Sequence, residues 1–213
     1  MRRRSVVVAL LCLLAVLPCP PSQARPAPEH TVKHIQQSIQ NCDLTSFERY
    51  VAINARIDNS LDVLTHHLQS ASLNGQDLPP ALSVMAMAAS ASGDSTLRNL
   101  LRNELGELIR YGVSSGVLNG QKKHSVDSES LLAPLLKKLT TGPKILRAAG
   151  KSRKDTSVSD AWLVPVEIYD TSSKSTYPFT LHLVPSGNDW QVDGIADIDA
   201  LLTRLEQRAG IMR

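Results

Sequence analysis

One stretch of this chain matches a catalytic motif. Gly112-Val113-Ser114-Ser115-Gly116 has the Gly-x-Ser-x-Gly spacing of a nucleophile elbow. In an elbow, the serine occupies a sharp turn between a buried strand and a helix of a parallel sheet. Here an amphipathic helical pattern precedes the motif and a loop follows it. We therefore interpret the stretch as a flexible helix C-terminus, where glycine is preferred, and not as a nucleophile.

Histidines occur twice at spacings that a metal could use. His30 and His34 are four residues apart, and the pair His66-His67 follows Asp62 closely. Zinc sites in proteins use three or four ligands, and no cluster of cysteine or histidine completes either group. We predict surface histidines, with an ion pair between Asp62 and His66, and neither a metal nor a cofactor.

Two further side chains could carry chemistry. Cys42 is the one cysteine outside the first 24 residues, and the adjacent Asp43 disfavours a reactive thiolate. The role of Cys42 stays open between a buried or tolerated thiol and an intermolecular disulfide. Tyr50 is the nearest candidate for acid–base catalysis, and a pocket that joins it to a buried carboxylate would favour an enzyme.

The apolar pattern around which these residues must be arranged lies between residues 161 and 198. Three runs alternate apolar and polar side chains with the period of a half-buried strand, and a Pro185-Ser186-Gly187-Asn188 turn precedes the last run. The side chains that share one apolar face are predicted to be Trp162, Val164, Val166, Ile168, Phe179, Leu181, Leu183, Trp190 and Val192. His182 and Thr180 belong to the opposite, polar face.

The apolar face has two interpretations. Trp162, Val164, Val166, Phe179, Leu181 and Trp190 form either a core face or the lining of a site for an apolar ligand. Because no inward position of this face is titratable, acid–base catalysis would depend on the helices alone. We therefore predict no catalytic residue on the sheet.

Helical periodicity occupies most of the chain before the sheet. A disordered lead-in over Arg25 to His30 is expected to precede a first helix, and Asp43 can cap a second one that ends near Val51. Further helices are predicted from the stripe Ile57, Leu61, Leu64, Leu68, from an uncharged segment over residues 81–92, from a stripe Leu97, Leu100, Leu101, Leu105, Leu108, Ile109, and from the leucines of residues 131–139.

These elements predict a single α+β domain over residues 25–213. N-terminal helices would pack on a C-terminal four-stranded antiparallel meander, followed by a terminal helix that starts at Asp197 or Asp199. The first strand is expected over Lys144 to Lys151. No internal repeat or long linker separates the helices from the sheet.

The first 24 residues have the pattern of a secretory signal peptide. Arg2, Arg3 and Arg4 precede an apolar run over residues 6–17, and Ser22-Gln23-Ala24 supplies small residues for cleavage. The run is shorter than the roughly 20 apolar residues that span a bilayer. We expect a secreted or periplasmic protein without a transmembrane segment after the signal peptide is removed.

Charge does not favour a nucleic-acid partner. Removal of the first 24 residues takes three of the 23 basic residues and none of the 20 acidic ones, which leaves 20 of each. The segment Gly120 to Lys154 is nevertheless basic, with nine lysines and arginines against Asp127 and Glu129. It is interpreted as a solvated face, and contact with an anionic membrane surface is the alternative.

Two stretches resemble a known family. They are Asp43 to Val51, and Phe179 to Leu183 together with Asp189 to Ile195. Together they resemble a family of secreted bacterial proteins of unknown function, whose helices carry Asp-Leu-x-x-Phe-x-x-Tyr-Val and whose sheet ends in Trp-x-Val. The sheet is also similar to cone-shaped domains of the nuclear-transport-factor-two type, which include isomerases, ligand carriers and interaction modules. Ala52 stands where family members often have an acidic residue, so no role of that carboxylate is carried over.

The sequence as a whole predicts an exported bacterial envelope protein that is not an enzyme. It would be a binding or interaction module for an unknown protein or an apolar small molecule. A carrier or sensor of an apolar small molecule in a cone-shaped cavity is the alternative, and an acid–base enzyme is the third hypothesis. A carrier requires an open cavity, whereas an interaction module fills the sheet face.

Overall fold

The structure is a computed structural model, and it describes residues 25–54, 57, 61–63, 66, 95–121 and 142–209. Several predicted features lie outside these residues. They are the signal peptide, Leu64 and Leu68 of the third helix, the segment 81–92, the helix over 131–139 and most of the basic segment Gly120 to Lys154.

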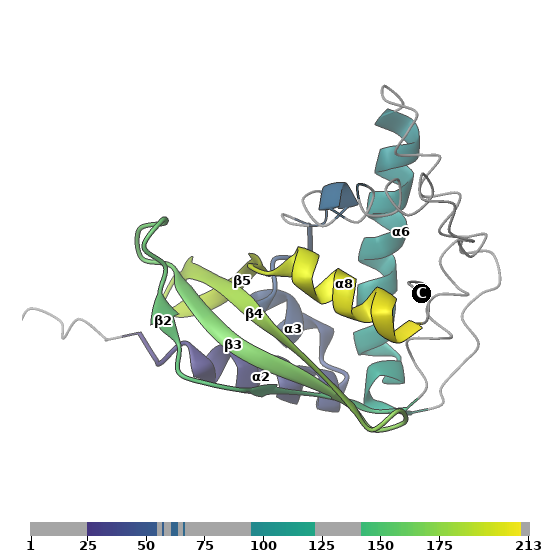
Figure 1. The fold of residues 1–213 in the computed structure, drawn as a ribbon, viewed down its shortest axis with the longest axis horizontal. Coiled ribbons are helices and arrows are strands. Elements are labelled where there is room, and N and C mark those ends of the chain that lie inside the picture. The colour runs from purple at the N-terminus through teal and green to yellow at the C-terminus, as the bar shows by residue number, and fades with distance from the viewer. Residues whose placement is uncertain are drawn as a thin grey trace, which may run out of the picture.

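The described residues form the predicted α+β fold. One antiparallel sheet contains β1 (Lys144–Ala148), β3 (Trp162–Asp170), β4 (Ser175–Ser186) and β5 (Asp189–Ile195) in that spatial order (Figure 1). This is the predicted four-stranded meander. A two-residue strand, β2 (Arg153–Lys154), adds to it by pairing with β3 beyond the end of β1.

The first strand is shorter than predicted. It ends at Ala148, which pairs with Val166, and the chain rejoins the sheet only at Arg153, which pairs with Leu163. The gap lies opposite Pro165 of β3. Proline has no N–H to donate to a ladder, so the neighbouring chain cannot form a regular ladder there. The interruption therefore follows from one residue of the partner strand.

The predicted alternation along the strands is confirmed. Side chains at every second position are buried, namely Val164, Val166, Phe179, Leu181, Leu183, Trp190 and Val192. Trp162 and Ile168 are partly exposed and pack against the same core. The indole rings of Trp162 and Trp190 meet edge to face, with centroids 6.2 Å apart.

Helix α2 (Glu29–Asn41) runs along the sheet, and α3 (Leu44–Tyr50) lies beside it (Figure 1). Val32 and Ile35 of α2 and Phe47 of α3 are buried against the sheet residues. Side-chain hydrogen bonds add to this packing. Leu146 N donates to Gln36 Oε1 at 2.6 Å, which satisfies an outward N–H of the edge strand β1. Thr31 Oγ1 donates to Trp190 O at 3.3 Å.

The predicted disordered lead-in is wrong. Trp190 Nε1 donates a hydrogen bond of 2.8 Å to Pro26 O, and the Arg25 guanidinium lies 5.3 Å from the Trp190 ring centroid. Pro28 is buried, and α2 already begins at Glu29. The lead-in is ordered by an indole more than 160 residues away in the chain, which no local pattern reveals.

Helix α6 (Ser95–Ser114) stands at one end of the sheet, and the 3₁₀ helix η2 (Val117–Asn119) follows it (Figure 1). Leu101 and Val113 are buried, as are Ile57 and Leu61 of the third predicted helix. Leu100 was predicted on the core side, but its side chain is 44% exposed. Neighbouring side chains of an α-helix point about 100° apart, so Leu100 points away from the core when Leu101 points into it.

The terminal helix α8 (Ile198–Ala209) starts where predicted and lies beside β4 where β5 has ended. Asp197 Oδ1 accepts from Thr180 N at 2.7 Å, and Arg204 Nη1 donates to Pro178 O at 2.7 Å. These bonds satisfy backbone groups of β4 that no longer face a strand. The helix therefore protects an edge of the sheet.

Candidate functional site

The six residues predicted as a ligand site or core face lie in the core. Val164, Val166, Phe179, Leu181 and Trp190 are buried, and Trp162 packs against them. Helices α2 and α3 supply apolar side chains to the same cluster. This face of the sheet is therefore packed against protein in the described part of the chain.

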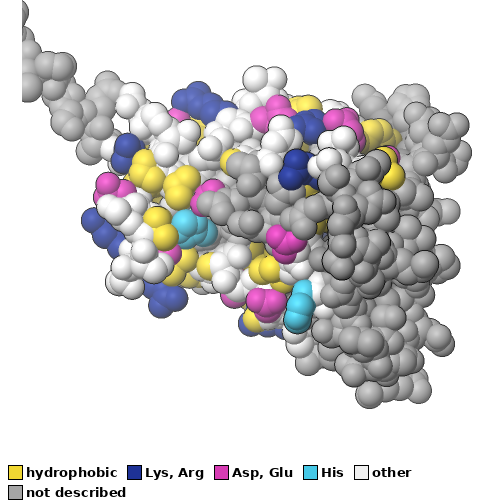
Figure 2. Space-filling view, turned by 90° about the horizontal axis from the view of Figure 1, so that it is seen from above, with side chains coloured by type: hydrophobic (Ala, Val, Ile, Leu, Met, Phe, Trp, Pro, Cys, Tyr) yellow, Lys and Arg dark blue, Asp and Glu magenta, His cyan; other side chains and the backbone are white. Residues whose placement is uncertain are grey.

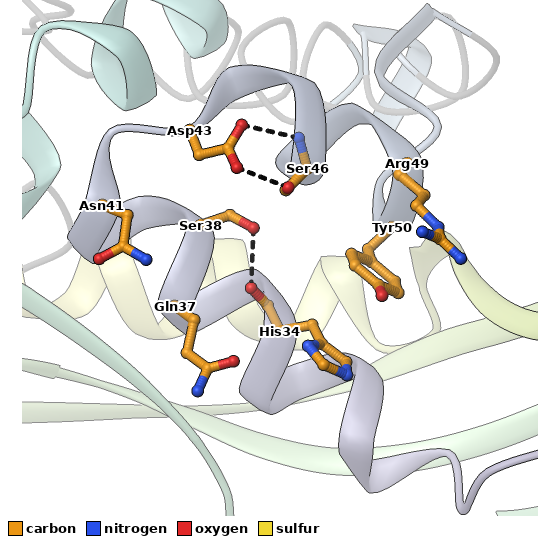
Figure 3. Close-up of a pocket in the computed structure, with 8 residues that line it drawn as sticks. All are labelled: His34, Gln37, Ser38, Asn41, Asp43, Ser46, Arg49 and Tyr50. Carbon is orange, nitrogen blue, oxygen red and sulfur yellow. Dashed lines mark hydrogen bonds between the residues drawn. The ribbon is translucent and has the colours of Figure 1, made fainter.

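A different site opens between the two N-terminal helices. This pocket has a volume of about 180 Å³. Polar side chains of both helices line it (Figure 3). From α2 come His34, Gln37, Ser38 and Asn41, and from α3 and its cap come Asp43, Ser46, Arg49 and Tyr50. Spacings of three or four residues place each set on one face of its helix. His34, Gln37 and Asn41 are exposed, so the pocket lies on the polar side of α2, away from the core.

Tyr50 connects this pocket to the core. Its side chain is only 9% exposed and belongs to the core cluster. Its ring stacks on the exposed His34 imidazole, with centroids 4.9 Å apart and planes inclined by 6°. The Arg49 guanidinium lies 5.5 Å from the Tyr50 ring centroid, within cation–π range. The tyrosine is thus held in place on several sides.

Asp43 is the carboxylate of the pocket, and it is the cap of α3, as the sequence predicts. Its side chain accepts from Ser46 N at 3.0 Å and from Ser46 Oγ at 2.6 Å. These two hydrogen bonds lower the pKa of Asp43 below its ordinary value. Asp43 is exposed, so the described lining of the pocket does not join Tyr50 to a buried carboxylate.

Several polar groups of the pocket have no hydrogen-bond partner among the described residues. They are the side-chain amides of Gln37 and Asn41 and the hydroxyl of Tyr50. By contrast, Ser38 Oγ donates to His34 O at 2.8 Å within α2. The pocket therefore presents hydrogen-bonding capacity that the fold itself does not use.

The rim of the pocket is tied to the sheet. Arg49 Nη2 lies 2.5 Å from Asp189 Oδ2 at the start of β5. Gln191 Nε2 reaches Glu48 O and Arg49 O at 3.4 and 3.2 Å. The C-terminal end of α3 is consequently anchored to β5 through side chains, which fixes the position of the pocket relative to the core.

The polar face of the sheet carries a cluster that sequence reasoning missed. His182 lies on that face, as predicted, with Nε2 3.3 Å from Asp155 Oδ2 and Nδ1 3.3 Å from Asp193 Oδ2. The three side chains are only 13–17% exposed. Asp155 follows β2, and Asp193 sits at the β-bulge between β4 and β5. The bulge brings Asp193 to the imidazole, and no sequence spacing indicates it.

Hydrogen bonds also hold the loop that carries Asp155. The Asp155 carboxylate accepts from Ser157 N at 2.8 Å and from Ser157 Oγ at 2.6 Å. These bonds, and secondarily the charge of a protonated His182, lower the pKa of Asp155 below its ordinary value.

Figure 2 shows a face on which histidine, acidic, basic and hydrophobic side chains are interspersed.

The catalytic motif lies at a helix end. Ser114 is the last residue of α6, and Gly116 has φ of 74°, the left-handed conformation typical of a helix C-terminus. This confirms the helix C-terminus predicted for this stretch. Cys42 ends α2 in the same conformation, and its thiol lies 4.0 Å from Gln121 Oε1.

Within the described ranges, no group of three or more His, Cys, Asp or Glu side chains has the geometry to hold a metal ion. None of the described helices is both long and apolar enough to cross a membrane. The chain matches no family model, no curated protein and no solved structure. The relationship to the secreted family and to the cone-shaped domains therefore stays a prediction.

Proposed function

We propose that this protein is an exported bacterial envelope protein that binds a partner without catalysing a reaction. One observation carries the proposal. The apolar sheet face is packed against α2 and α3, while the pocket between these helices presents Gln37, Asn41 and Tyr50 groups that have no hydrogen-bond partner among the described residues. Polar groups that converge on one pocket can fix the orientation of a bound molecule.

The same packing sets the order of the alternatives. A carrier of an apolar molecule would use the inner face of the sheet, where Leu181 and Leu183 belong to the same buried cluster as Val32 and Phe47 of the helices. An acid–base enzyme would pair Tyr50 with a buried carboxylate, whereas Asp43 is exposed and serves as a helix cap. A binding module therefore precedes the carrier and the enzyme in this proposal. Export rests on the basic and apolar pattern of residues 1–24.

The test begins with the full-length gene expressed in its own cells. The protein recovered from the envelope fraction is examined by native mass spectrometry and, after cross-linking in the cells, by identification of linked partners. We expect a bound molecule or a reproducible linked partner, and Gln37→Ala together with Asn41→Ala should reduce its recovery. Gln40→Ala is the matched control, because Gln40 is an exposed glutamine of the same helix outside the pocket. Finding the protein in the cytoplasmic fraction would contradict the proposal. So would an unchanged yield of the bound molecule or linked partner in the two pocket variants.

A further inference from the structure

The pocket between α2 and α3 differs from an apolar ligand site in size as well as in chemistry. Its volume of about 180 Å³ exceeds the roughly 30 Å³ that one water molecule occupies in the liquid. It is smaller than the roughly 300–1,000 Å³ of pockets for drug-sized ligands. A molecule of about one six-membered ring is therefore the size that the pocket accommodates.

The free groups of the pocket donate and accept in similar number. Each of the Gln37 and Asn41 amides offers two N–H donors and a carbonyl oxygen, and the Tyr50 hydroxyl can do both. A carboxylate or phosphate ligand only accepts, and an ammonium ligand only donates, so either would leave part of this set unpaired. A hydroxyl group donates one hydrogen bond and accepts others, so a ligand rich in hydroxyls matches the whole set.

Charge in the pocket also favours a neutral ligand. The Arg49 guanidinium is already paired with Asp189, and the Asp43 carboxylate already accepts two hydrogen bonds from Ser46. The two opposite charges lie on the same short helix and its cap. An anion attracted by Arg49 would meet Asp43, and a cation attracted by Asp43 would meet Arg49. Neither sign of ligand charge finds an uncompensated partner.

A flat ring completes the arrangement. His34 is exposed, and Tyr50 supports it from one side by parallel stacking (Figure 3). Both rings line the pocket, so the stacked pair forms part of its wall. We propose that the α2–α3 pocket binds one neutral, hydroxyl-rich ring, that is, a sugar residue, through Gln37, Asn41 and Tyr50. This inference rests on the proposed binding function and specifies the ligand class.

The experiment uses the full chain as its own cells process it, labelled with ¹⁵N and observed by NMR. D-Glucose and N-acetyl-D-glucosamine are the sugar probes. Acetate is the anionic probe, and ethylammonium is the cationic probe. We expect at least one sugar to cause saturable shifts of the Gln37 and Asn41 side-chain amides, while both charged probes cause none.

Two variants locate the interaction. Gln37→Ala removes an amide, and Tyr50→Phe removes the hydroxyl but keeps the ring that stacks on His34. Each is expected to weaken sugar binding about tenfold, as the loss of one good hydrogen bond does. Gln40→Ala is expected to leave the affinity unchanged, because Gln40 does not line the pocket.

Three outcomes overturn the inference. They are the absence of saturable shifts with both sugars, equal binding of acetate or ethylammonium at the same amides, and sugar affinity that neither variant changes. If neither sugar causes saturable shifts, the proposed function still holds when a partner is recovered with the envelope protein and its yield depends on Gln37. If no such partner is recovered either, the proposed function fails together with the ligand class.

Discussion

The ring of Tyr50 stacks on the imidazole of His34 with nearly parallel planes and with ring centroids 4.9 Å apart. The tyrosine side chain reaches this position from the core, where it packs among sheet and helix residues. One residue therefore belongs both to the hydrophobic core and to the polar pocket. Changes that alter only its hydroxyl can separate binding from stability.

The first prediction concerns that separation. Tyr50→Ala should lower the free energy of unfolding by about 3 kcal/mol, because it leaves a cavity in the core and removes the stack. Tyr50→Phe should change it by less than about 1 kcal/mol, because the hydroxyl has no hydrogen-bond partner among the described residues. Urea unfolding followed by circular dichroism measures both values. Equal losses for the two variants would mean that the hydroxyl is engaged in the fold.

The second prediction concerns two glycines with positive φ. Gly116 has φ of +74°, and a Cβ built on it would lie 2.8 Å from Gln121 Oε1 and 3.0 Å from Cys42 Sγ. Gly187 has φ of +57°, with nothing within 4 Å of such a Cβ. Gly187→Ala should cost about 1 kcal/mol for the left-handed backbone alone, and Gly116→Ala should cost more because of the contacts. Thermal and urea unfolding measure the stability of both variants. A larger loss of stability for Gly187→Ala than for Gly116→Ala would contradict this prediction.

The third prediction concerns the ion pair between Lys144 Nζ and Asp170 Oδ1, which are 2.8 Å apart. Burial by itself would raise the pKa of Asp170, but Lys144 and Ser172 outweigh it and hold this pKa well below its ordinary value of 3.8. A carboxyl with a lowered pKa in the folded state stabilises the fold above the unfolded-state pKa, and this contribution is lost as pH falls. Asp170→Asn should therefore destabilise the protein by about 2 kcal/mol at neutral pH, and by progressively less below about pH 4.

Unfolding free energies measured from pH 7 to about pH 3 check this sign. Asp160→Asn is the control, because Asp160 is an exposed aspartate in the loop before β3. If the loss of stability caused by Asp170→Asn is the same at every pH, the hydrogen bonds of this side chain, and not its charge, stabilise the pairing of β1 with β3.

The fourth prediction concerns the cluster of His182 with Asp155 and Asp193. His182→Leu leaves two largely buried carboxylates without the imidazole between them and should cost about 2 kcal/mol at neutral pH. Adding Asp193→Asn to His182→Leu should restore part of this loss, because a neutral amide costs less than a carboxylate to leave buried without the imidazole. Urea unfolding measures the single and double variants, and purely additive losses would show that His182 and Asp193 do not interact.

Much of the secondary structure follows from local patterns in the sequence. The sheet face was predictable because residues two apart in a strand point the same way, so Val164, Phe179 and Trp190 could be assigned to one side. The Asp43 cap was predictable because its hydrogen bonds reach only to Ser46, three residues along the chain. Pro165 in the sequence indicates that a ladder is interrupted, but only the strand register shows that the interruption shortens β1.

The arrangements that could carry function depend on residues far apart in the chain. The pocket requires the sides of α2 and α3 to meet at a particular angle, which core packing of Phe47 and Val32 sets. The contact of His182 with Asp155 and Asp193 needs a loop and a β-bulge from different strands. The order at Pro26 comes from Trp190, at the other end of the chain.

The sequence by itself determined which residues are apolar, which face of each strand they share and where short helices begin, because these depend on periodicity and on bonds between near neighbours. Only the tertiary structure decided which of the predicted helices cover the sheet face and that a polar pocket lies between α2 and α3. The physical reason is that the direction in which two helices pack is set by contacts summed over the whole core, and no single segment contains that information.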